Sequence, residues 1–354
     1  MLRNLIDRAA KAERFIFLEY FILAEGKLWD ELEKILCAKA REGVEVKIIF
    51  DDFGNIKRFS GETIDRLREV GVEVFIFNPV HEYVNRLHFN YRDHRKIACI
   101  DGDVAYTGGV NIADEYANLI ERFGYWKDSG VCLEGEGAWG LTASFNRMCV
   151  NLGGVMHNEH DYYRPHTPVK SEGFCQPFTD GPQNNPDNPA EDVFLQMISG
   201  ARRFLYITTP YFIPDESLMR ALCIAGDGGV DVRLMLPGKP DHWYADCVAE
   251  SYFGELIKHG VKVYRYTPGF LHGKSIMVDR EAAFVGSANM DYRSFELDYE
   301  CGVMVYSAPM IESLLEDMDM IVEHSRLVTK EEWAKRSVLR RVFEPLLRLF
   351  AIWM

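Results

Sequence analysis

The sequence predicts an α/β protein in which one βαβ-rich half occurs twice, with mixed sheets packed about a pseudo-twofold axis. Three observations predict this fold: sequence blocks recur in the same order in both halves, short β-branched and aromatic runs alternate with helical stretches, and 47% of the residues are hydrophobic. With 354 residues, such a chain can bury a substantial core.

Four blocks carry the repeat. One of them, GVEVKIIF, returns as GVDVRLML, and the other three recur with similar likeness. The first copies begin at residues 12, 43, 71 and 93, and the second copies begin in the same order at residues 201, 229, 260 and 271. We expect the apolar blocks to contain strands and the stretches at 28–43 and 217–229 to be helices.

A segment without regular periodicity joins the two halves. Residues 166–192, HTPVKSEGFCQPFTDGPQNNPDNPAED, are rich in Pro, Asn, Asp and Gly and show neither helical nor strand periodicity. We therefore expect the boundary near residue 185. Residues 1–185 then form the first half with its connecting loop, and residues 186–354 form the second half with a C-terminal amphipathic tail.

The charge of the chain argues against one broad class of partner. A formal net charge of −14 gives no electrostatic basis for nonspecific binding of DNA or RNA, so no nucleic-acid partner is expected. The eight cysteines form no CxxC pair, which predicts buried thiols in a reducing compartment. We also expect neither a signal peptide nor a membrane-spanning helix, because no uninterrupted apolar run reaches about 18 residues.

Each half carries the same short constellation of polar residues. A histidine is followed two residues later by a lysine, then by an aspartate and a Gly-(Gly/Ser)-x-Asn turn. The members are His94, Lys96, Asp101, Gly109 and Asn111 in the first half, and His272, Lys274, Asp279, Ser287 and Asn289 in the second. Residues i and i+2 of a strand share a face, so each histidine and lysine should project into one space. Each aspartate should face the other way, as a structural or supporting group.

This set of side chains suits a phosphodiester. If the halves pack about a twofold axis, the two His-Lys pairs meet in one cleft. Lysines and amides there can hold the nonbridging oxygens while a histidine on each side attacks or protonates in line. A single His-x-Lys would be read as a solvated surface strand, but two matched copies favour a site. No metal and no organic cofactor are expected, because the lysines supply the positive charge that a metal would bring.

These motifs resemble the signature of the phospholipase D superfamily, HxKxxxxD followed by a G-[GS]-x-N turn, and the resemblance covers nearly the whole chain. Within that superfamily the sequence is most similar to the bacterial cardiolipin synthases. The similarity rests on HFNYRDHRKIACIDGDVAYTGGVNIADEYA, FGYWKDSGVCLEG, ITTPYFIPDESL and LPGKPDH. The blocks TPYFIP and PGKPDH are much narrower signals than HxKxxxxD.

The resemblance implies a covalent phosphatidyl-histidine intermediate. His94 is then the nucleophile and His272 the acid that protonates the departing glycerol, although the reverse assignment stays open. An acidic residue after each motif orients the histidine in this superfamily, and aligning YWKDSGV with LDYECGV nominates Asp128, which has the shorter reach, and Glu300. The other motif residues divide into catalytic lysines, Lys96 and Lys274; phosphate-binding residues, Asn111, Asn289, Ser287 and Gly109; and supporting residues, Asp101 and Asp279.

The resemblance also implies a partner and a location. Cardiolipin synthases use the hydroxyl of a second phosphatidylglycerol as acceptor, so we expect this anionic phospholipid as substrate at a membrane surface. The location would be the cell membrane, bound peripherally or on the cytoplasmic side. Such synthases usually begin with two transmembrane helices, whereas this chain starts at the catalytic unit, as a trimmed chain or a peripherally bound member would. The tail at 337–354, SVLRRVFEPLLRLFAIWM, would either lie in the membrane interface or pack on the body.

Several other residues belong to the narrower blocks. Tyr211 and Phe212 follow the strand block whose first copy carries Glu19, and we expect these positions to line the cleft, although packing alone also explains the aromatics. His242 has either a substrate contact or a structural role. Because an acidic protein must approach an anionic lipid, the rim of the cleft should be basic or apolar.

Three other functions compete with lipid transfer. A phospholipase D that hydrolyses phospholipid, or a metal-independent phosphodiesterase acting on nucleic acid, would use the same motifs. A catalytically silent membrane-binding scaffold would keep the fold alone. The acidic net charge argues against the nuclease, and two intact motifs argue against the silent scaffold. The oligomeric state cannot be predicted from these features.

Overall fold

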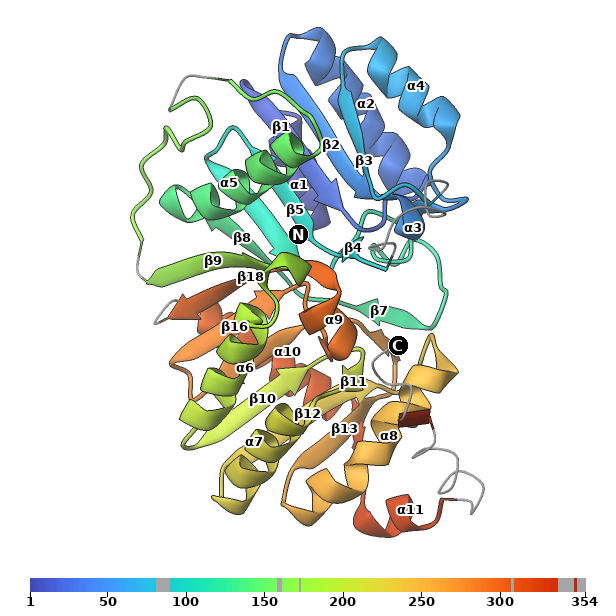
Figure 1. The fold of residues 1–354 in the computed structure, drawn as a ribbon, viewed down its shortest axis with the longest axis vertical. Coiled ribbons are helices and arrows are strands. Elements are labelled where there is room, and N and C mark those ends of the chain that lie inside the picture. Colours follow the sequence, from blue (N-terminus) through green and yellow to red (C-terminus); the bar gives the residue numbers. More distant parts are fainter. Residues whose placement is uncertain (81–89, 158–160, 172, 307–308, 337–346, 349–354) are drawn as a thin grey trace.

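Two mixed sheets, one above the other in Figure 1, form the body of the molecule, with helices on their faces. This duplicated α/β architecture confirms the predicted fold class. The computed structural model describes residues 1–80, 90–157, 161–171, 173–306, 309–336 and 347–348.

The two sheets repeat one strand order. The first runs β3-β2-β1-β5-β6-β8, and the second contains the equivalent run β13-β12-β10-β15-β16-β18. In both, the first three strands are mutually parallel and the others antiparallel. The bounds are β1 (Phe15–Tyr20), β2 (Glu45–Asp51), β3 (Glu73–Phe77), β5 (Lys96–Ile100), β6 (Val104–Gly108), β8 (Gly130–Glu134), β10 (Phe204–Thr208), β12 (Asp231–Pro237), β13 (Lys262–Tyr266), β15 (Ser275–Val278), β16 (Ala282–Gly286) and β18 (Asp298–Tyr306).

Helices cover the outer faces of the sheets and also lie between them (Figure 1). The helices expected at 28–43 and 217–229 are confirmed as α2 (Lys27–Arg41) and α7 (Glu216–Asp227). Asp215 starts α7 because its carboxylate accepts the backbone N–H groups of Ser217 and Leu218. The other helices are α1 (Leu2–Ala9), α3 (Asp52–Asn55), α4 (Gly61–Glu69), α5 (Glu136–Asn151), α6 (Pro189–Gly200), α8 (Trp243–Lys258), α9 (Tyr292–Glu296), α10 (Met310–Glu323) and α11 (Lys330–Ala334).

Alternate strand residues enter different hydrophobic clusters. In β1, Phe15 and Phe17 join a buried cluster that also contains Tyr206 and Met277 of the second half. The neighbouring Ile16 instead belongs to the cluster beneath α1 and α2. The shared cluster takes further side chains from α5 and α10. One hydrophobic core therefore joins the two sheets and fixes how they face each other.

The connection between the halves contains an unexpected strand. β9 (Phe174–Asp180) pairs along its whole length with β18, so the prediction that residues 166–192 lack a strand is wrong. Pro177 and the exposed Phe174 interrupt the pattern expected of a strand in the sequence. Pairing with the long strand β18, rather than local β propensity, stabilises β9. β9 precedes residue 185 and yet hydrogen-bonds to the second sheet.

Short strands link the sheets further. β4 (Arg92–Asp93) of the first half pairs with β18, and β14 (Gly269–Leu271) of the second half pairs with β7 (Tyr125–Lys127) of the first. β19 (Ser325–Leu327) extends the second sheet beside β13, and β11 (Phe212–Ile213) pairs with β17 (Met290–Asp291).

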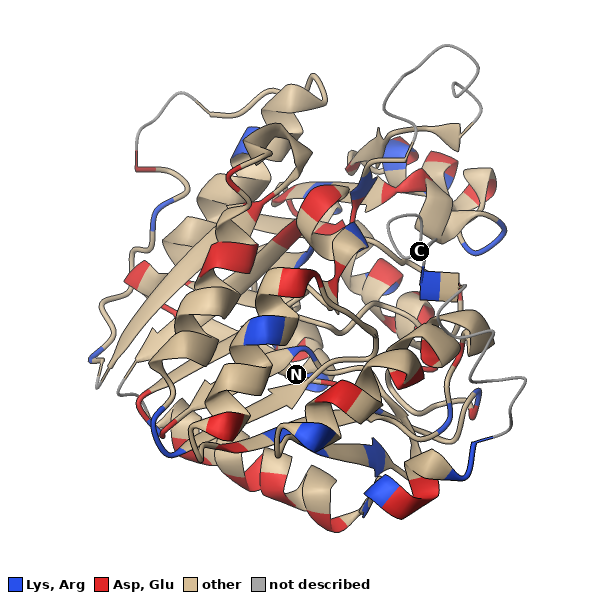
Figure 2. Ribbon diagram, turned by 60° about the horizontal axis from the view of Figure 1, so that its bottom comes forward, with Lys and Arg blue, Asp and Glu red and all other residues tan. Residues whose placement is uncertain are grey.

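Charged residues are distributed over many elements of the described fold (Figure 2). Figure 2 shows Asp and Glu spread over helices and loops rather than gathered on one element. Among the described residues, no helix combines the length and apolar character that a bilayer span requires. No disulfide joins the eight cysteines, all of which lie among the described residues, but Cys132 and Cys175 are exposed, so the prediction of buried thiols is wrong for these two. Most of the predicted amphipathic tail lies outside the described residues; Leu347 packs on the second half, and Arg348 lies 3.9 Å from the ring centroid of Tyr252.

Asp101 and Asp279 occupy equivalent turns. Both have φ of 53°, in the left-handed region that Asp tolerates better than most residues. The carboxylate of Asp279 accepts N–H groups of Arg202, Arg203 and Phe204, each at 2.8 Å. Asp101 accepts the corresponding N–H groups at the start of β1. Each aspartate therefore holds the beginning of the central strand of its own sheet.

We expect Asp279→Asn to lower the free energy of unfolding by about 1–3 kcal/mol, because three hydrogen bonds to a charged acceptor are weakened. Backbone N–H groups outweigh the effect of burial and lower the pKa of Asp279. The stabilisation is therefore complete above the unfolded pKa of about 3.9 and disappears as the pH falls through the folded value. Urea unfolding at pH 7 measures the effect, with the half-exposed Asp319→Asn as control. Equal stability of the two variants would contradict this role.

Candidate active site

The two motif histidines lie where the halves exchange strands. His94 directly follows β4, and its backbone N–H donates to the carbonyl of Tyr299 at 2.9 Å. His272 directly follows β14, and its backbone N–H donates to the carbonyl of Lys127 at 2.6 Å. Neither histidine belongs to the strand that contains or follows its lysine. The expectation of one continuous strand through His-x-Lys is wrong, because the strand that pairs with the opposite half ends just before each histidine and the strand of the histidine's own sheet begins only at or after the lysine.

Each histidine is held by a carboxylate from the other half. His94 Nδ1 lies 2.9 Å from Glu300 Oε1, and His272 Nδ1 lies 2.7 Å from Asp128 Oδ2. All four side chains are at most 12% exposed. The Nε2 atoms are thus on the sides of the rings away from the carboxylates, which fixes how each imidazole can meet a substrate.

The two motif lysines are buried behind the histidines. Lys274 Nζ donates to the carbonyl of His272 at 2.6 Å and lies 2.9 Å from both ring nitrogens, and Lys96 Nζ donates to the carbonyl of His94. Burial, opposed by the carboxylates of Glu300 and Asp128, lowers the pKa of Lys96 to about 8 and that of Lys274 to about 7. An anionic substrate would restore the charged form of both ammonium groups.

The two imidazoles are neutral at pH 7. Burial and the nearby lysines lower the pKa of His94 well below its ordinary value and that of His272 to about 4. Their carboxylate partners differ. Burial raises the pKa of Glu300 to about 7, whereas the pKa of Asp128 is lowered because His272 and Lys274 outweigh its burial. Asp128 therefore presents a full negative charge to His272, and Glu300 a partial one to His94.

The Gly-(Gly/Ser)-x-Asn turns support these carboxylates. Ser287 is fully buried and its hydroxyl donates to Glu300 Oε2. A Cβ on Gly109, its counterpart, would lie only 2.2 Å from Asp128 Oδ1. The contact of Ser287 and Gly109 with phosphate stays a prediction; in the structure the hydroxyl donates to Glu300, and the glycine leaves the space that Asp128 fills.

The two motif asparagines differ in what they contact. Asn111 Oδ1 accepts the N–H of Ile22 at 3.0 Å, and its Nδ2 donates to the Tyr116 hydroxyl at 2.8 Å. Asn289 Oδ1 is buried without a hydrogen-bond partner, and its side chain lines the pocket. Of this pair, Asn289 is the amide available to a ligand, whereas Asn111 orients Tyr116, whose ring lies edge-on at 5.3 Å from His272.

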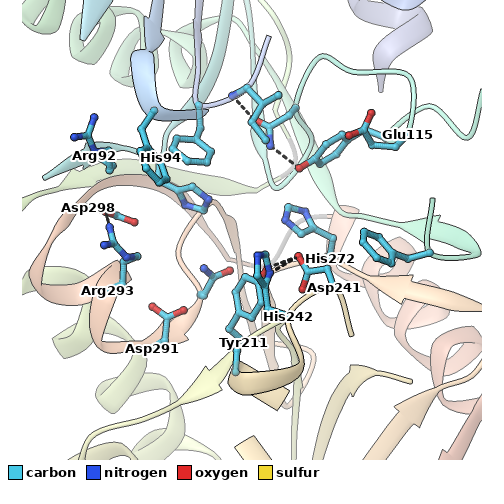
Figure 3. A pocket seen from close by; sticks show the side chains of 18 of the residues that line it. Arg92, His94, Glu115, Tyr211, Asp241, His242, His272, Asp291, Arg293 and Asp298 are labelled. Atoms are coloured by element: carbon cyan, nitrogen blue, oxygen red, sulfur yellow. Dashed lines mark hydrogen bonds and ion pairs between the residues drawn. The ribbon is translucent and has the colours of Figure 1, made fainter. Parts of the chain in front are cut away.

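Both histidines open into one pocket of about 760 Å³ between the halves (Figure 3). The apolar lining is extensive and comprises Phe21, Ile22, Phe53, Tyr116, Phe123, Trp126, Tyr211, Ile213, Tyr244 and Ala245. The charged lining is mixed and comprises Arg58, Arg92, Arg122, Arg293, Glu115, Asp241, Asp291 and Asp298. The cleft has the expected apolar residues and four arginines, together with carboxylates that were not expected.

A polar cluster from the second half faces this pocket. The Tyr211 hydroxyl donates to Asp241 Oδ2 at 2.6 Å, and His242 Nδ1 lies 3.0 Å from the same oxygen. This hydrogen bond raises the pKa of His242. Phe212 and Glu19, by contrast, are buried away from the cleft, and Glu19 pairs with Arg95 at 2.5 Å. Sequence analysis singled out Tyr211 and His242 but not Asp241 or the four arginines.

One group of potential metal ligands occurs among the described residues. One ligand atom from each of His94, Asp298 and Glu300 lies within 4.8 Å of the others. Asp298 is already paired with Arg293 at 3.0 Å, and the positive charge of Lys96 acts on Glu300. These neighbouring cations oppose a divalent ion at this position.

Comparison with known proteins identifies the family of the chain. A family model described as "Cardiolipin synthase, PLD-like domain" matches residues 2–121 and 194–322, one segment in each half. The cardiolipin synthases of Halalkalibacterium halodurans and Clostridium perfringens are 38% and 36% identical over 96% and 99% of this chain, which correspond to 67% and 74% of their own lengths. A protein of Streptococcus mutans with no assigned function is 38% identical over 96% of this chain and 74% of its own.

A solved structure shares the fold. Phosphatidylserine synthase of Haemophilus influenzae superposes with a TM-score of 0.70 at 16% identity, over 99% of this chain and 89% of its own. Such low identity supports the architecture alone. The family model and the sequence relatives go further: the chain belongs to the cardiolipin synthase family of phospholipase D-like proteins.

Proposed function

We propose that this enzyme transfers a phosphatidyl group from one phosphatidylglycerol to another, giving cardiolipin and glycerol through a phosphatidyl-histidine intermediate. One observation carries the proposal: two imidazoles from different halves open into one pocket, and each is held at Nδ1 by a carboxylate. Family membership supports the phospholipid class of the substrate.

In the first step, the lone pair of one Nε2 attacks phosphorus. A P–N bond forms while the bond from phosphorus to the glycerol oxygen breaks, and the opposite histidine gives that oxygen a proton. In the second step, this histidine removes the proton from the hydroxyl of the acceptor, which attacks phosphorus. A new P–O bond forms as the P–N bond breaks and its electron pair returns to the ring. Attack by water instead gives phosphatidic acid.

The unequal carboxylates support His94 as the nucleophile. Glu300 is only partly ionised near pH 7, which favours a neutral ring at His94 until the P–N bond makes it cationic. Asp128 is ionised and, together with the negative charge of the bound phosphodiester, favours uptake of a proton by His272, whose pKa is otherwise about 4; this protonated ring then acts as the acid. Lys96, Lys274 and Asn289 would neutralise and orient the phosphate oxygens, while Asp101 and Asp279 support the strands.

The mouth of the pocket supports contact with a membrane surface. Exposed apolar residues adjoin lining residues in three separate segments: Ile56 follows Phe53, Leu119 and Ile120 follow Tyr116, and Trp243 precedes Tyr244. Trp243 is 65% exposed, which is unusual for so large an apolar side chain. We propose that these residues enter the lipid interface, so that the enzyme acts at a membrane bound from its pocket side.

The primary test is incubation of the purified protein with phosphatidylglycerol vesicles in excess chelator, with mass spectrometry of the lipids. We expect cardiolipin and free glycerol, and a loss of at least about 10³-fold in rate for His94→Ala and His272→Ala, since each removes a reacting group. The exposed His324→Ala serves as control. Phosphatidic acid alone would make the protein a hydrolase, and unchanged activity of His94→Ala would refute the mechanism.

A second experiment identifies the nucleophile. With His272→Ala, formation of the intermediate and its breakdown are both slowed, so quenching at neutral to alkaline pH should preserve the phosphatidyl adduct. Peptide mass spectrometry should find the added mass on the peptide containing His94. An adduct on His272 in the matched His94→Ala protein, with none on His94 in His272→Ala, would reverse the assignment.

The pH dependence of kcat/KM should be bell-shaped, with a maximum near pH 7. Below about pH 7, Glu300 takes up a proton and no longer stabilises the cationic ring at His94. Above about pH 7, Lys274 and then Lys96 lose their protons, with pKa values of about 7 and 8, and cease to attract the phosphate. Glu300→Gln should flatten the acid limb only. A value of kcat/KM that does not change between about pH 6 and 10 would contradict these assignments.

A further inference from the structure

We infer that Arg58 and Arg122, bridged by Glu115, form a second phosphate subsite that binds the phosphodiester of the acceptor lipid. The reacting phosphate belongs between the two histidines. The acceptor phosphatidylglycerol carries a phosphate of its own, which must stay bound while its free hydroxyl reacts. The inference rests on the proposed function and adds a specificity for acceptors that carry a phosphate.

Among the described residues, the ion pairs of this cluster set two guanidinium groups against one carboxylate. Glu115 Oε1 accepts from Arg58 at 3.2 Å and from Arg122 at 3.0 Å. The carboxylate is 8% exposed, whereas the guanidinium side chains are 30% and 46% exposed, and all three residues line the pocket. A single carboxylate thus holds two arginines and offsets one of them. The remaining donors of a partly exposed, oriented pair suit an anionic phosphodiester.

The cluster lies on the His272 side of the pocket. Tyr116 follows Glu115 in the chain, and its ring contacts His272 edge-on at a centroid distance of 5.3 Å. In Figure 3, Glu115 and Asp241 lie toward His272, whereas Arg92, Arg293 and Asp298 lie toward His94.

The stereochemistry of transfer requires the acceptor on this side. The glycerol leaves from the face of phosphorus opposite the new bond to His94, and the acceptor hydroxyl must attack through the same face. That face is where His272 gives and then removes the proton. The acceptor phosphate is only a three-carbon glycerol away from the attacking oxygen, so it must lie in the part of the pocket next to His272.

The arginines near His94 are more fully engaged. Arg92 is 5% exposed and pairs with Asp51 at 3.4 Å. Arg293 donates to Asp298 at 3.0 Å and to both the backbone and side-chain oxygens of Asn90. These contacts tie Arg92 and Arg293 to the protein itself. Arg122 is the most exposed of the four lining arginines, at 46%, and Arg58, which is as exposed as Arg293 at 30%, shares its carboxylate partner with Arg122.

The experiment compares two acceptors with the full chain. Formation of cardiolipin uses an acceptor with a phosphate, whereas exchange of labelled glycerol into phosphatidylglycerol uses the same donor and an acceptor without one. For Arg58→Gln, Arg122→Gln and the double variant, we expect the ratio of cardiolipin formation to glycerol exchange to fall roughly tenfold to a hundredfold, as for loss of a charge-assisted hydrogen bond. Arg122→Lys should restore part of the ratio, because the charge returns.

Arg66→Gln is the matched control, since Arg66 also pairs with a glutamate, Glu33, at 3.2 Å and is 54% exposed but does not line the pocket. Its ratio should equal that of the unchanged protein. If the Arg58 and Arg122 variants carry out both reactions and keep the ratio of the unchanged protein, the subsite is refuted while the proposed function stands. An unchanged protein that makes no cardiolipin would overturn the proposed function and the subsite with it.

Discussion

Two crossed hydrogen bonds, from His94 to Glu300 and from His272 to Asp128, are the interactions on which the site depends. In each, the imidazole comes from one half and the carboxylate from the other. The backbone repeats the pattern, because each histidine N–H donates to a carbonyl of the opposite half. Neither half contains a complete site by itself. The shared hydrophobic cluster between the sheets therefore has a functional consequence, since it sets the distance across which these bonds form.

Burial is what makes this cluster reactive. Two histidines and two lysines are brought together in the interior of an acidic protein, and desolvation lowers the pKa of all four. The empty site is thus short of positive charge relative to the same residues in water. An anionic phosphodiester reverses that effect because its charge favours protonated lysines and an imidazolium. In the proposed mechanism, the site would gain its catalytic charge state from the bound substrate.

Divergence of the two copies would give the halves different tasks in the proposed mechanism. In the first half, Gly109 lies against the shorter side chain of Asp128. In the second half, Ser287 donates a hydrogen bond to the longer side chain of Glu300. The two carboxylate sites therefore differ in the length of the acid and in the presence of a hydroxyl group. The asparagines diverge too, since Asn111 is bound within the first half while Asn289 Oδ1 has no partner. A double displacement needs one nucleophile and one acid. These small departures from twofold symmetry distinguish the two histidines that the repeat made alike.

The sequence predicted what depends on local pattern. Matched blocks implied two equivalent sheets, and aligning YWKDSGV with LDYECGV found both carboxylates. The alignment could not reveal that each carboxylate hydrogen-bonds to the histidine of the other half, because that pairing follows from how the halves pack. β9 was missed for the same reason, as its pairing partner lies more than a hundred residues away. Arg58 and Arg122 lie in loops outside the repeated blocks, where spacing carries no signal. A duplicated motif predicts only residues that both halves share. Residues that bind the second lipid in one step of the proposed reaction have no counterpart in the other half, so the repeat cannot predict them.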